Sequence, residues 1–192
     1  MPYTNDWFSH NIPNWTKILS PFIGKEDLNF LEIGCYEGKA THWLCKNVLT
    51  HPSSKITVVD TFEGSIEHHD GKANTDFSVV EKNFRENTAD YLDKIDIFKT
   101  YSQHYLREIS GAVYDFIYID GSHTAPDVLE DAVLAWRLLK TGGVMIFDDY
   151  AWDAYKNQPE LNPRLAIDSF LAVMAGKYEL LLKDYQVAIK KV

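Results

Sequence analysis

The side chains best placed for chemistry are carboxylates that directly follow short, largely apolar runs. Asp60 follows one such run, Asp120 a second, and the pair Asp148 and Asp149 a third. Runs of this kind are typical of strands that are covered on both faces of a parallel sheet. Ligands of such sheets bind at the carboxyl ends of the strands, so we expect these acids to share one site.

A glycine-containing turn follows the apolar run that ends at Ile33. Gly34 has no Cβ, so the chain can turn sharply there and approach a ligand closely. Gly38 allows the next helix to begin tight against the turn. Asp60 follows Gly34 at close to the spacing of ribose-binding acids in doubly wound nucleotide folds. Together they predict an adenosine pocket; the alternative is an ordinary strand-to-helix turn.

The acidic residues of this turn indicate which nucleotide it binds. Glu32 and Glu37 would repel the pyrophosphate of a dinucleotide, and the glycine order differs from the dinucleotide pattern G-x-G-x-x-G. A ligand with an ammonium group and a sulfonium would be attracted. We therefore expect S-adenosylmethionine and disfavour an NAD-dependent oxidoreductase. The residues of this region expected to hold the cofactor are Glu32, Gly34, Tyr36, Gly38 and Asp60.

The carboxylates of Asp120, Asp148 and Asp149 are expected to meet at the mouth of this pocket. Like charges in one cleft repel, so something must offset them. Mg²⁺ prefers oxygen ligands and would do so; it would also lower the pKa of an acceptor hydroxyl. We expect these three residues to bind Mg²⁺ and Asp120 to contribute to catalysis. The alternative has no metal, with one carboxylate on the ammonium group of the cofactor and another capping a loop.

His123 lies three residues beyond Asp120, in the loop expected to cover the site. A neutral imidazole is a suitable general base for a hydroxyl proton near pH 7. We expect His123 to be that base, the alternative being a loop histidine that only packs or hydrogen-bonds.

Apolar periodicity predicts alternating strands and helices. The expected strands are 29–33, 56–59, 95–99, 115–119, 144–147, 178–183 and 186–190, and the expected helices are 39–49, 76–87, one from Pro126 that Gly142 and Gly143 stop, and 164–175. Alternation predicts right-handed βαβ units in a parallel, doubly wound α/β sheet, and the last two strands add an antiparallel pair. Residues 1–28 are expected to form a helical cap over the cofactor or a flap on the sheet edge.

Size and charge limit the classes of function. At 192 residues the chain is expected to form one domain, 1–192. The net charge of −9 and the lack of a basic stripe argue against nucleic-acid partners. No long apolar run or leader is found, and Cys35 and Cys45 are expected to be reduced, which predicts a cytoplasmic protein without a membrane span. The aromatic N-terminal segment leaves homo-oligomers open.

With these residues in view, the chain resembles class I S-adenosylmethionine-dependent methyltransferases over nearly its whole length. The turn 32–38 resembles the first motif of that family, and Asp60 matches its ribose-binding acid. Residues 138–143 resemble its Leu-Lys-Pro-Gly-Gly segment, with Thr141 in the proline place. The segment 114–123 resembles a small-molecule subgroup that includes macrolide-sugar O-methyltransferases. The resemblance implies a Rossmann-like sheet of seven strands, order 3-2-1-4-5-7-6, with strand 7 antiparallel.

The resemblance also implies roles for single residues. It places Ser102 and Asp120 at the cofactor, Ser102 near the adenine, and it places metal ligands at the ends of strands four and five. Some sugar methyltransferases of this type have an aspartate as proposed base where this chain has Ser122, which leaves His123 as the expected base. The implied activity is methyl transfer to a hydroxyl of a small molecule, with a sugar or glycan unit as candidate. The alternatives are a metal-independent methyltransferase with another acceptor and a non-catalytic cofactor-binding subunit.

Overall fold

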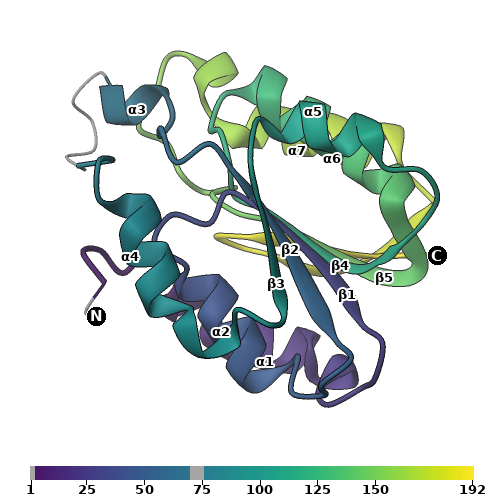
Figure 1. Ribbon diagram of the computed structural model, residues 1–192. Coiled ribbons are helices and arrows are strands. Elements are labelled where there is room, and N and C mark those ends of the chain that lie inside the picture. The colour runs from purple at the N-terminus through teal and green to yellow at the C-terminus, as the bar shows by residue number, and fades with distance from the viewer. Residues whose placement is uncertain (1–2, 70–75) are drawn as a thin grey trace.

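The computed structural model describes residues 3–69 and 76–192 and contains a seven-stranded sheet (Figure 1). The strand order β3-β2-β1-β4-β5-β7-β6 confirms the predicted order, and β7 runs antiparallel to both β5 and β6. The strands are β1 (Asn29–Ile33), β2 (Lys55–Asp60), β3 (Ile95–Lys99), β4 (Tyr114–Ile119), β5 (Leu139–Phe147), β6 (Tyr178–Lys183) and β7 (Val187–Lys191).

Helices cover both faces of the sheet because successive side chains of each strand point to opposite faces. Phe30 of β1, for example, belongs to one buried cluster and Leu31 to the other. On one face lie α1 (Ile12–Ile18), α2 (Lys39–Asn47) and α4 (Val80–Asn87), and on the other α5 (Ser102–Glu108), α6 (Ala125–Leu138) and α7 (Pro163–Val173) (Figure 1). Shorter helices are α3 (Ile66–His69) and the 3₁₀ turns η1 (Ser9–Asn11), η2 (Ser20–Phe22), η3 (Ala89–Tyr91) and η4 (Pro159–Leu161). None of the helices in the described part of the chain has the length and apolar character to cross a membrane.

The N-terminal segment packs mainly on a face of the sheet and not on its edge. Trp15 of α1 is fully buried, its ring edge-on to Phe116 and Tyr118 of β4 at centroid distances of 5.6 and 4.7 Å. Its indole nitrogen donates a hydrogen bond of 2.7 Å to Gln186. The helix is therefore part of the core, and only a few residues before it reach the pocket described below.

Most element boundaries differ from the predicted ones by a few residues, and three differences are larger. The helix α6 ends at Leu138, before Gly142 and Gly143, which instead lie inside β5 beside an irregularity in its pairing with β4. The helix expected over 76–87 begins only at Val80. The helix α5 after β3 was not predicted; with seven residues it is too short for a clear apolar period.

The registers of the central strands bring three strand ends together. Ile33 pairs with both Val59 and Ile119, and Ile119 pairs with Phe147. The residues that follow these strands therefore lie next to one another at the same edge of the sheet. The pocket lies at this edge.

Candidate active site

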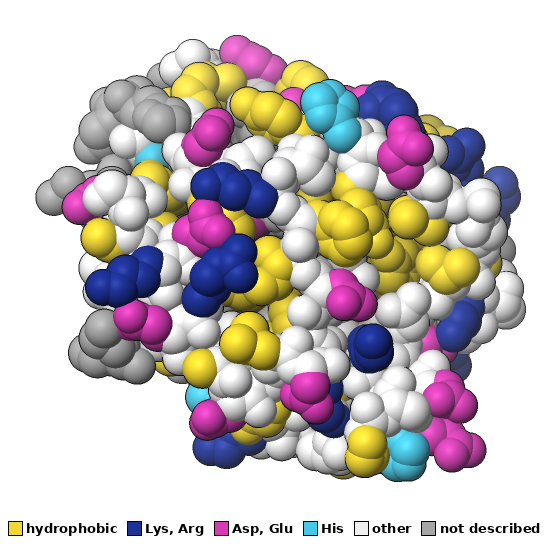
Figure 2. All heavy atoms as spheres, viewed as in Figure 1, with side chains coloured by type: hydrophobic (Ala, Val, Ile, Leu, Met, Phe, Trp, Pro, Cys, Tyr) yellow, Lys and Arg dark blue, Asp and Glu magenta, His cyan; other side chains and the backbone are white. Residues whose placement is uncertain are grey.

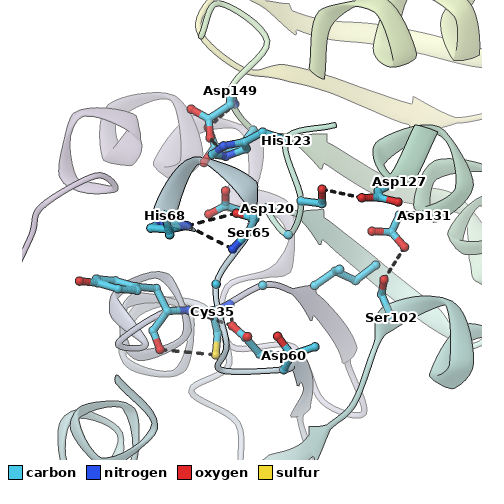
Figure 3. A pocket seen from close by; sticks show the side chains of 18 of the residues that line it. Cys35, Asp60, Ser65, His68, Ser102, Asp120, His123, Asp127, Asp131 and Asp149 are labelled. Carbon is cyan, nitrogen blue, oxygen red and sulfur yellow. Dashed lines mark hydrogen bonds and ion pairs between the residues drawn. The ribbon is translucent and has the colours of Figure 1, made fainter. Parts of the chain in front are cut away.

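A cavity of about 900 Å³ opens at the carboxyl ends of the parallel strands. This volume is near the upper end of the range of ligand pockets, ~300–1,000 Å³, and is large enough for two small molecules. Figure 3 shows Asp149 and His123 at one end of the cavity, Ser102 and Asp131 at another, and Asp60 beside the turn that follows β1.

The turn after β1 has left-handed backbone at three positions. Gly34 has φ 78°, and a Cβ added there would lie 2.0 Å from the carbonyl oxygen of Asp120. Gly38 has φ 80°, and a Cβ there would lie 2.8 Å from the ring of Phe84. Tyr36 has φ 50° although it is not a glycine, which is unusual for a bulky residue. Both glycines are thus required by close approach, and the chain is held in a strained conformation at the pocket.

Asp60 fixes the shape of this turn. Its Oδ2 accepts hydrogen bonds from the backbone N–H groups of Cys35 (2.7 Å) and Tyr36 (3.2 Å), and its Oδ1 accepts one from Phe62 (2.7 Å). The carboxylate lines the cavity, and Oδ1, which accepts one hydrogen bond, has a further lone pair. The residue can therefore order the turn and also accept a hydrogen bond from a hydroxyl of a ligand.

Two of the residues predicted to hold the cofactor do not line the cavity. Glu32 is 1% exposed and accepts a 2.7 Å hydrogen bond from Thr41, behind the turn. Burial raises the pKa of Glu32 to about 8, so its neutral form is favoured. Gly38 lies at the start of α2, against Phe84. Both residues shape the turn, whereas Gly34, Tyr36, Asp60, Ser102 and Asp120 all line the cavity.

A buried tyrosine joins two of the predicted carboxylates. The hydroxyl of Tyr118 lies 2.9 Å from Asp120 and is also hydrogen-bonded to Asp148. Burial and the neighbouring carboxylates raise the pKa of Asp120 well above its usual range, and burial and Asp149 raise that of Asp148 to about 7. One hydroxyl carries one proton and can donate to one carboxylate at a time. The pair is thus stable only with a further proton or a cation nearby.

The side chain of His123 lies close to the carboxylates of Asp120 and Asp149. Nε2 of His123 lies 2.8 Å from Oδ2 of Asp149, whose Oδ1 accepts a 2.5 Å hydrogen bond from Tyr185. One donor atom from each of Asp120, His123 and Asp149 lies within 4.8 Å of the others. This spacing fits ligands around one metal ion.

The group of closely spaced donor atoms differs in one member from the metal ligands that the sequence predicts. Asp148 is 8% exposed, and its two oxygens accept hydrogen bonds from Tyr118 and from the backbone N–H of Asp149. It therefore supports the cluster, and His123 takes its place in the group that could hold a metal ion. Asp149 has φ 54°, a left-handed conformation that is uncommon for a residue other than glycine.

Ser102 is hydrogen-bonded at the far end of the cavity. Its hydroxyl donates a 2.6 Å hydrogen bond to Oδ1 of Asp131, a residue of α6 that is 2% exposed. On the same helix, Oδ2 of Asp127 accepts hydrogen bonds from the hydroxyls of Ser122 (2.7 Å) and Thr124 (2.8 Å). At this end of the cavity, the hydroxyl groups donate their protons to carboxylates, so their oxygens can only accept further hydrogen bonds.

Aromatic rings form another wall of the cavity. Trp7 lies over Tyr36 at 4.8 Å between centroids, and His68 packs edge-on against Phe77 at 4.7 Å. His68 lines the cavity. The side chain of His69 lies outside the described residues.

Sequence reasoning missed Tyr118 and Asp131. Tyr118 stands two residues before Asp120 and so points to the same face of the sheet, a signal that strand periodicity could have given. Asp131 lies one helical turn after Asp127 on the cavity side of α6. Its contact with Ser102 depends on the position of α5, which the sequence does not reveal.

Comparison with known proteins relates these features to other chains. A family model described as a methyltransferase domain matches residues 31–150, which include the turn, Asp60, Asp120, His123 and Asp149. An uncharacterized protein of Acanthamoeba polyphaga mimivirus, R132, is 26% identical over 166 residues, which cover 80% of this chain. The chain spans 64% of the length of that relative.

Solved structures share the fold at low sequence identity. A putative rRNA-methylase from Clostridium thermocellum has a TM-score of 0.70 and 14% identity, with 100% of both chains covered. An O-methyltransferase from Bacillus cereus, solved in complex with SAH, has a TM-score of 0.65 and 17% identity, with 99% of this chain and 84% of that chain covered.

Proposed function

We propose, from the premise that the chain belongs to this methyltransferase-domain family, that it transfers a methyl group from S-adenosylmethionine to a hydroxyl of a small molecule. A sugar or glycan unit is the candidate acceptor, and Mg²⁺ is the proposed metal. The observation that carries the proposal is the presence of the glycine turn and of the His123–Asp149 pair in one cavity.

The cofactor end is supported by the chemistry of the turn. Gly34 leaves space where a side chain would collide with Asp120. Asp60 presents a lone pair on Oδ1 for a ribose hydroxyl, and Tyr36 offers an aromatic surface beside it. Among the described lining residues there is no lysine or arginine, so this cavity favours a sulfonium and an ammonium group over a phosphate.

The acceptor end fits a divalent cation with open positions. Asp120, Asp149 and His123 supply two oxygens and one nitrogen, which leaves positions for water and for an acceptor hydroxyl. Mixed oxygen and nitrogen ligands also suit Mn²⁺, so both ions belong in the test. One observation favours a metal-independent reaction, namely that His123 and Asp149 already neutralise each other when the imidazole is protonated.

The roles of the side chains follow from their positions. When bound, the cofactor would supply an electrophilic methyl group, and the metal would lower the pKa of the acceptor hydroxyl. If it acts as a base and not as a metal ligand, His123 would accept the hydroxyl proton at Nε2, the nitrogen that faces Asp149, because its Nδ1 is buried. Tyr185 in turn holds Asp149. Trp152 lies 4.5 Å from His123 between ring centroids and limits access of water to the imidazole.

Charge favours a small acceptor over RNA. The net charge is −9, and Figure 2 shows acidic and basic side chains interspersed on the face that it displays, without a continuous basic stripe. RNA binding depends largely on neutralising phosphates with lysine and arginine. A neutral or cationic small molecule would not be repelled by the carboxylates of the cavity.

The test is a calorimetric titration of the full chain with S-adenosylhomocysteine, with Mg²⁺ and with a chelator, followed by transfer of labelled methyl groups to hydroxylated small molecules. We expect a Kd of ~1–50 µM in both buffers and transfer that requires Mg²⁺ or Mn²⁺. Transfer that persists in chelator would support the metal-independent alternative. Binding without transfer to any hydroxyl would support a non-catalytic subunit, and transfer to RNA alone would contradict a small acceptor.

A further inference from the structure

The turn between β6 and β7 places two successive side chains beside the pair Asp148 and Asp149. Tyr185 donates a hydrogen bond to Asp149. Gln186, the next residue, is 1% exposed and acts on Asp148. The proposed reaction uses neither Gln186 nor Trp15, which is hydrogen-bonded to it. A glutamine buried this deeply requires a reason, because burial of an amide is unfavourable unless its polar atoms have partners.

The hydrogen bond from Trp15 fixes the direction of the Gln186 amide. Trp15 is fully buried, and its Nε1 lies 2.7 Å from Oε1 of Gln186. An indole N–H can only donate, so it requires the amide oxygen, and Nε2 of Gln186 must point elsewhere. This Nε2 is buried and has no hydrogen bond of its own within the described residues. A buried donor in this state is costly unless a nearby acceptor makes use of it.

The acceptor near this donor is the carboxyl group of Asp148. Burial and the charge of Asp149 raise the pKa of Asp148, and Gln186 is one of the polar groups that lower it. The other donors to this carboxyl group are the hydroxyl of Tyr118 and the backbone N–H of Asp149. Gln186 therefore approaches Asp148 as a third donor, from the side of the terminal strand pair.

Asp148 connects the two carboxylates that are proposed as metal ligands. Its Oδ1 accepts a 2.7 Å hydrogen bond from the backbone N–H of Asp149, a residue with a left-handed φ of 54°. Its Oδ2 shares the hydroxyl of Tyr118 with Asp120. A shift of Asp148 would therefore disturb both Asp149 and Asp120. Groups that orient metal ligands typically change metal affinity by ~10–100-fold when they are removed.

We propose that Gln186, oriented by Trp15, is a positioning residue for the metal site, because it holds Asp148 between Asp120 and Asp149. The inference rests on the proposed function, because it assumes that a divalent cation binds there. It also gives the N-terminal helix α1 a role in the site, although Trp15 lies in the core and does not line the cavity. The three side chains act in series, from Trp15 to Gln186 to Asp148.

The experiment measures the affinity of the full chain for Mn²⁺, from the EPR signal of the free ion, with S-adenosylhomocysteine present. Gln186→Met keeps the approximate shape of the side chain and removes both polar atoms, so we expect the Kd for Mn²⁺ to rise by ~10-fold or more. Trp15→Phe keeps the amide but removes the donor that orients it, and we expect a rise of ~3–10-fold. In the double variant the Kd should equal that of Gln186→Met, because Trp15 acts only through Gln186.

A matched control lies in the same aromatic cluster. Trp43 packs edge-on against Trp15 at 5.9 Å between ring centroids, and its indole nitrogen makes no hydrogen bond in the part of the chain that the structure describes. Trp43→Phe should therefore lower the melting temperature, as Trp15→Phe does, and leave the Kd for Mn²⁺ unchanged.

An unchanged Kd in Gln186→Met, or equal rises in Trp15→Phe and Trp43→Phe, would overturn the inference and leave these residues a structural role. If Gln186→Met did not fold, an unchanged Kd in Trp15→Phe would overturn it alone. In these cases the wild type still binds Mn²⁺, and the proposed function stands. A wild type that binds S-adenosylhomocysteine but no Mn²⁺ would instead contradict the metal in the proposed function, and this inference with it.

Discussion

Nε2 of His123 lies 2.8 Å from Oδ2 of Asp149, although the two residues follow different strands. The contact forms because β4 and β5 end at the same level, with Ile119 paired to Phe147. Both side chains are about 15% exposed, 16% for His123 and 15% for Asp149, so the pair is shielded but still open to the cavity. Because Nδ1 of His123 is buried, Nε2 is the nitrogen that a ligand in the cavity could reach.

We expect His123→Gln to lower turnover by ~10²–10³-fold, because a positioned general base contributes about that factor. The affinity for S-adenosylhomocysteine should change less than ~3-fold, since His123 lies at the acceptor end. His104→Gln is the control, because His104 is exposed and does not line the cavity.

The same variant separates a base from a metal ligand. If His123 acts as a base, the Mg²⁺ concentration for half-maximal activity of His123→Gln should stay unchanged while kcat falls. If His123 is a metal ligand, this concentration should rise by ~10-fold or more, and excess Mg²⁺ should restore part of the turnover. Full activity of His123→Gln would contradict both roles.

Tyr185→Phe tests the residue that holds Asp149. The hydroxyl of Tyr185 donates a 2.5 Å hydrogen bond to Oδ1 of that carboxylate. Removing an interaction that orients a ligand typically reduces metal affinity or activity by ~10–100-fold, and we expect ~10-fold here, with the main effect on the Mg²⁺ dependence. Tyr91→Phe, outside the cavity, should leave the Mg²⁺ dependence unchanged; an equal effect of both variants would mean general destabilisation.

The alternation of strands and helices could be predicted because it depends on a one-dimensional pattern, whereas the strand order was implied by the family resemblance. Apolar runs alternate with amphipathic segments, and β1, β3 and β6 occupy the predicted residues. The carboxylates at strand ends could be brought together for the same reason, since parallel strands end at one edge. The segment over Gly142 and Gly143 was misjudged because glycines end helices and also occur at strand irregularities.

The division of roles between Asp148 and Asp149 could not be predicted. The two residues are adjacent and identical in type, and they differ in their partners: Asp148 accepts a hydrogen bond from Tyr118 and Asp149 one from Tyr185. Tyr185 lies between β6 and β7, far from Asp149 in the sequence, so the sequence does not reveal this contact. Glu32 was predicted to contact the cofactor, but its side chain points to the interior near Thr41 and not to the cavity. The sequence does not reveal to which side of β1 this side chain points.

Gly34→Ala tests the close approach of the turn to β4. The new Cβ would lie 2.0 Å from the carbonyl oxygen of Asp120, and φ is 78°. We expect a loss of more than about 3 kcal/mol in the free energy of unfolding, measured with urea, because strain and collision add. Gly111→Ala is the control: its φ is 83° but no atom lies within 4 Å, so only ~1 kcal/mol should be lost. Equal losses would show that the collision is relieved by a shift of the backbone.

Glu32→Gln tests the buried carboxyl group behind the turn. Burial raises the pKa of Glu32 from 4.5 to about 8 in the folded chain. Its contribution to stability is therefore complete below about pH 4.5 and is lost as the pH rises through about 8, a loss of roughly 3–5 kcal/mol. Glutamine stays neutral and can still accept the hydrogen bond from Thr41, so the variant should lose less stability than the wild type between pH 5 and 8.5.

The measurement is the melting temperature of both chains across that pH range. Some dependence should remain in Glu32→Gln, because the pKa values of Asp131 and Asp148 are also raised, to about 7. Glu160→Gln removes an exposed carboxylate and should follow the wild-type curve. Parallel curves for Glu32→Gln and the wild type would mean that Glu32 is charged in the folded chain at neutral pH. The acidic turn would then carry a charge near the sulfonium, as the sequence alone had suggested.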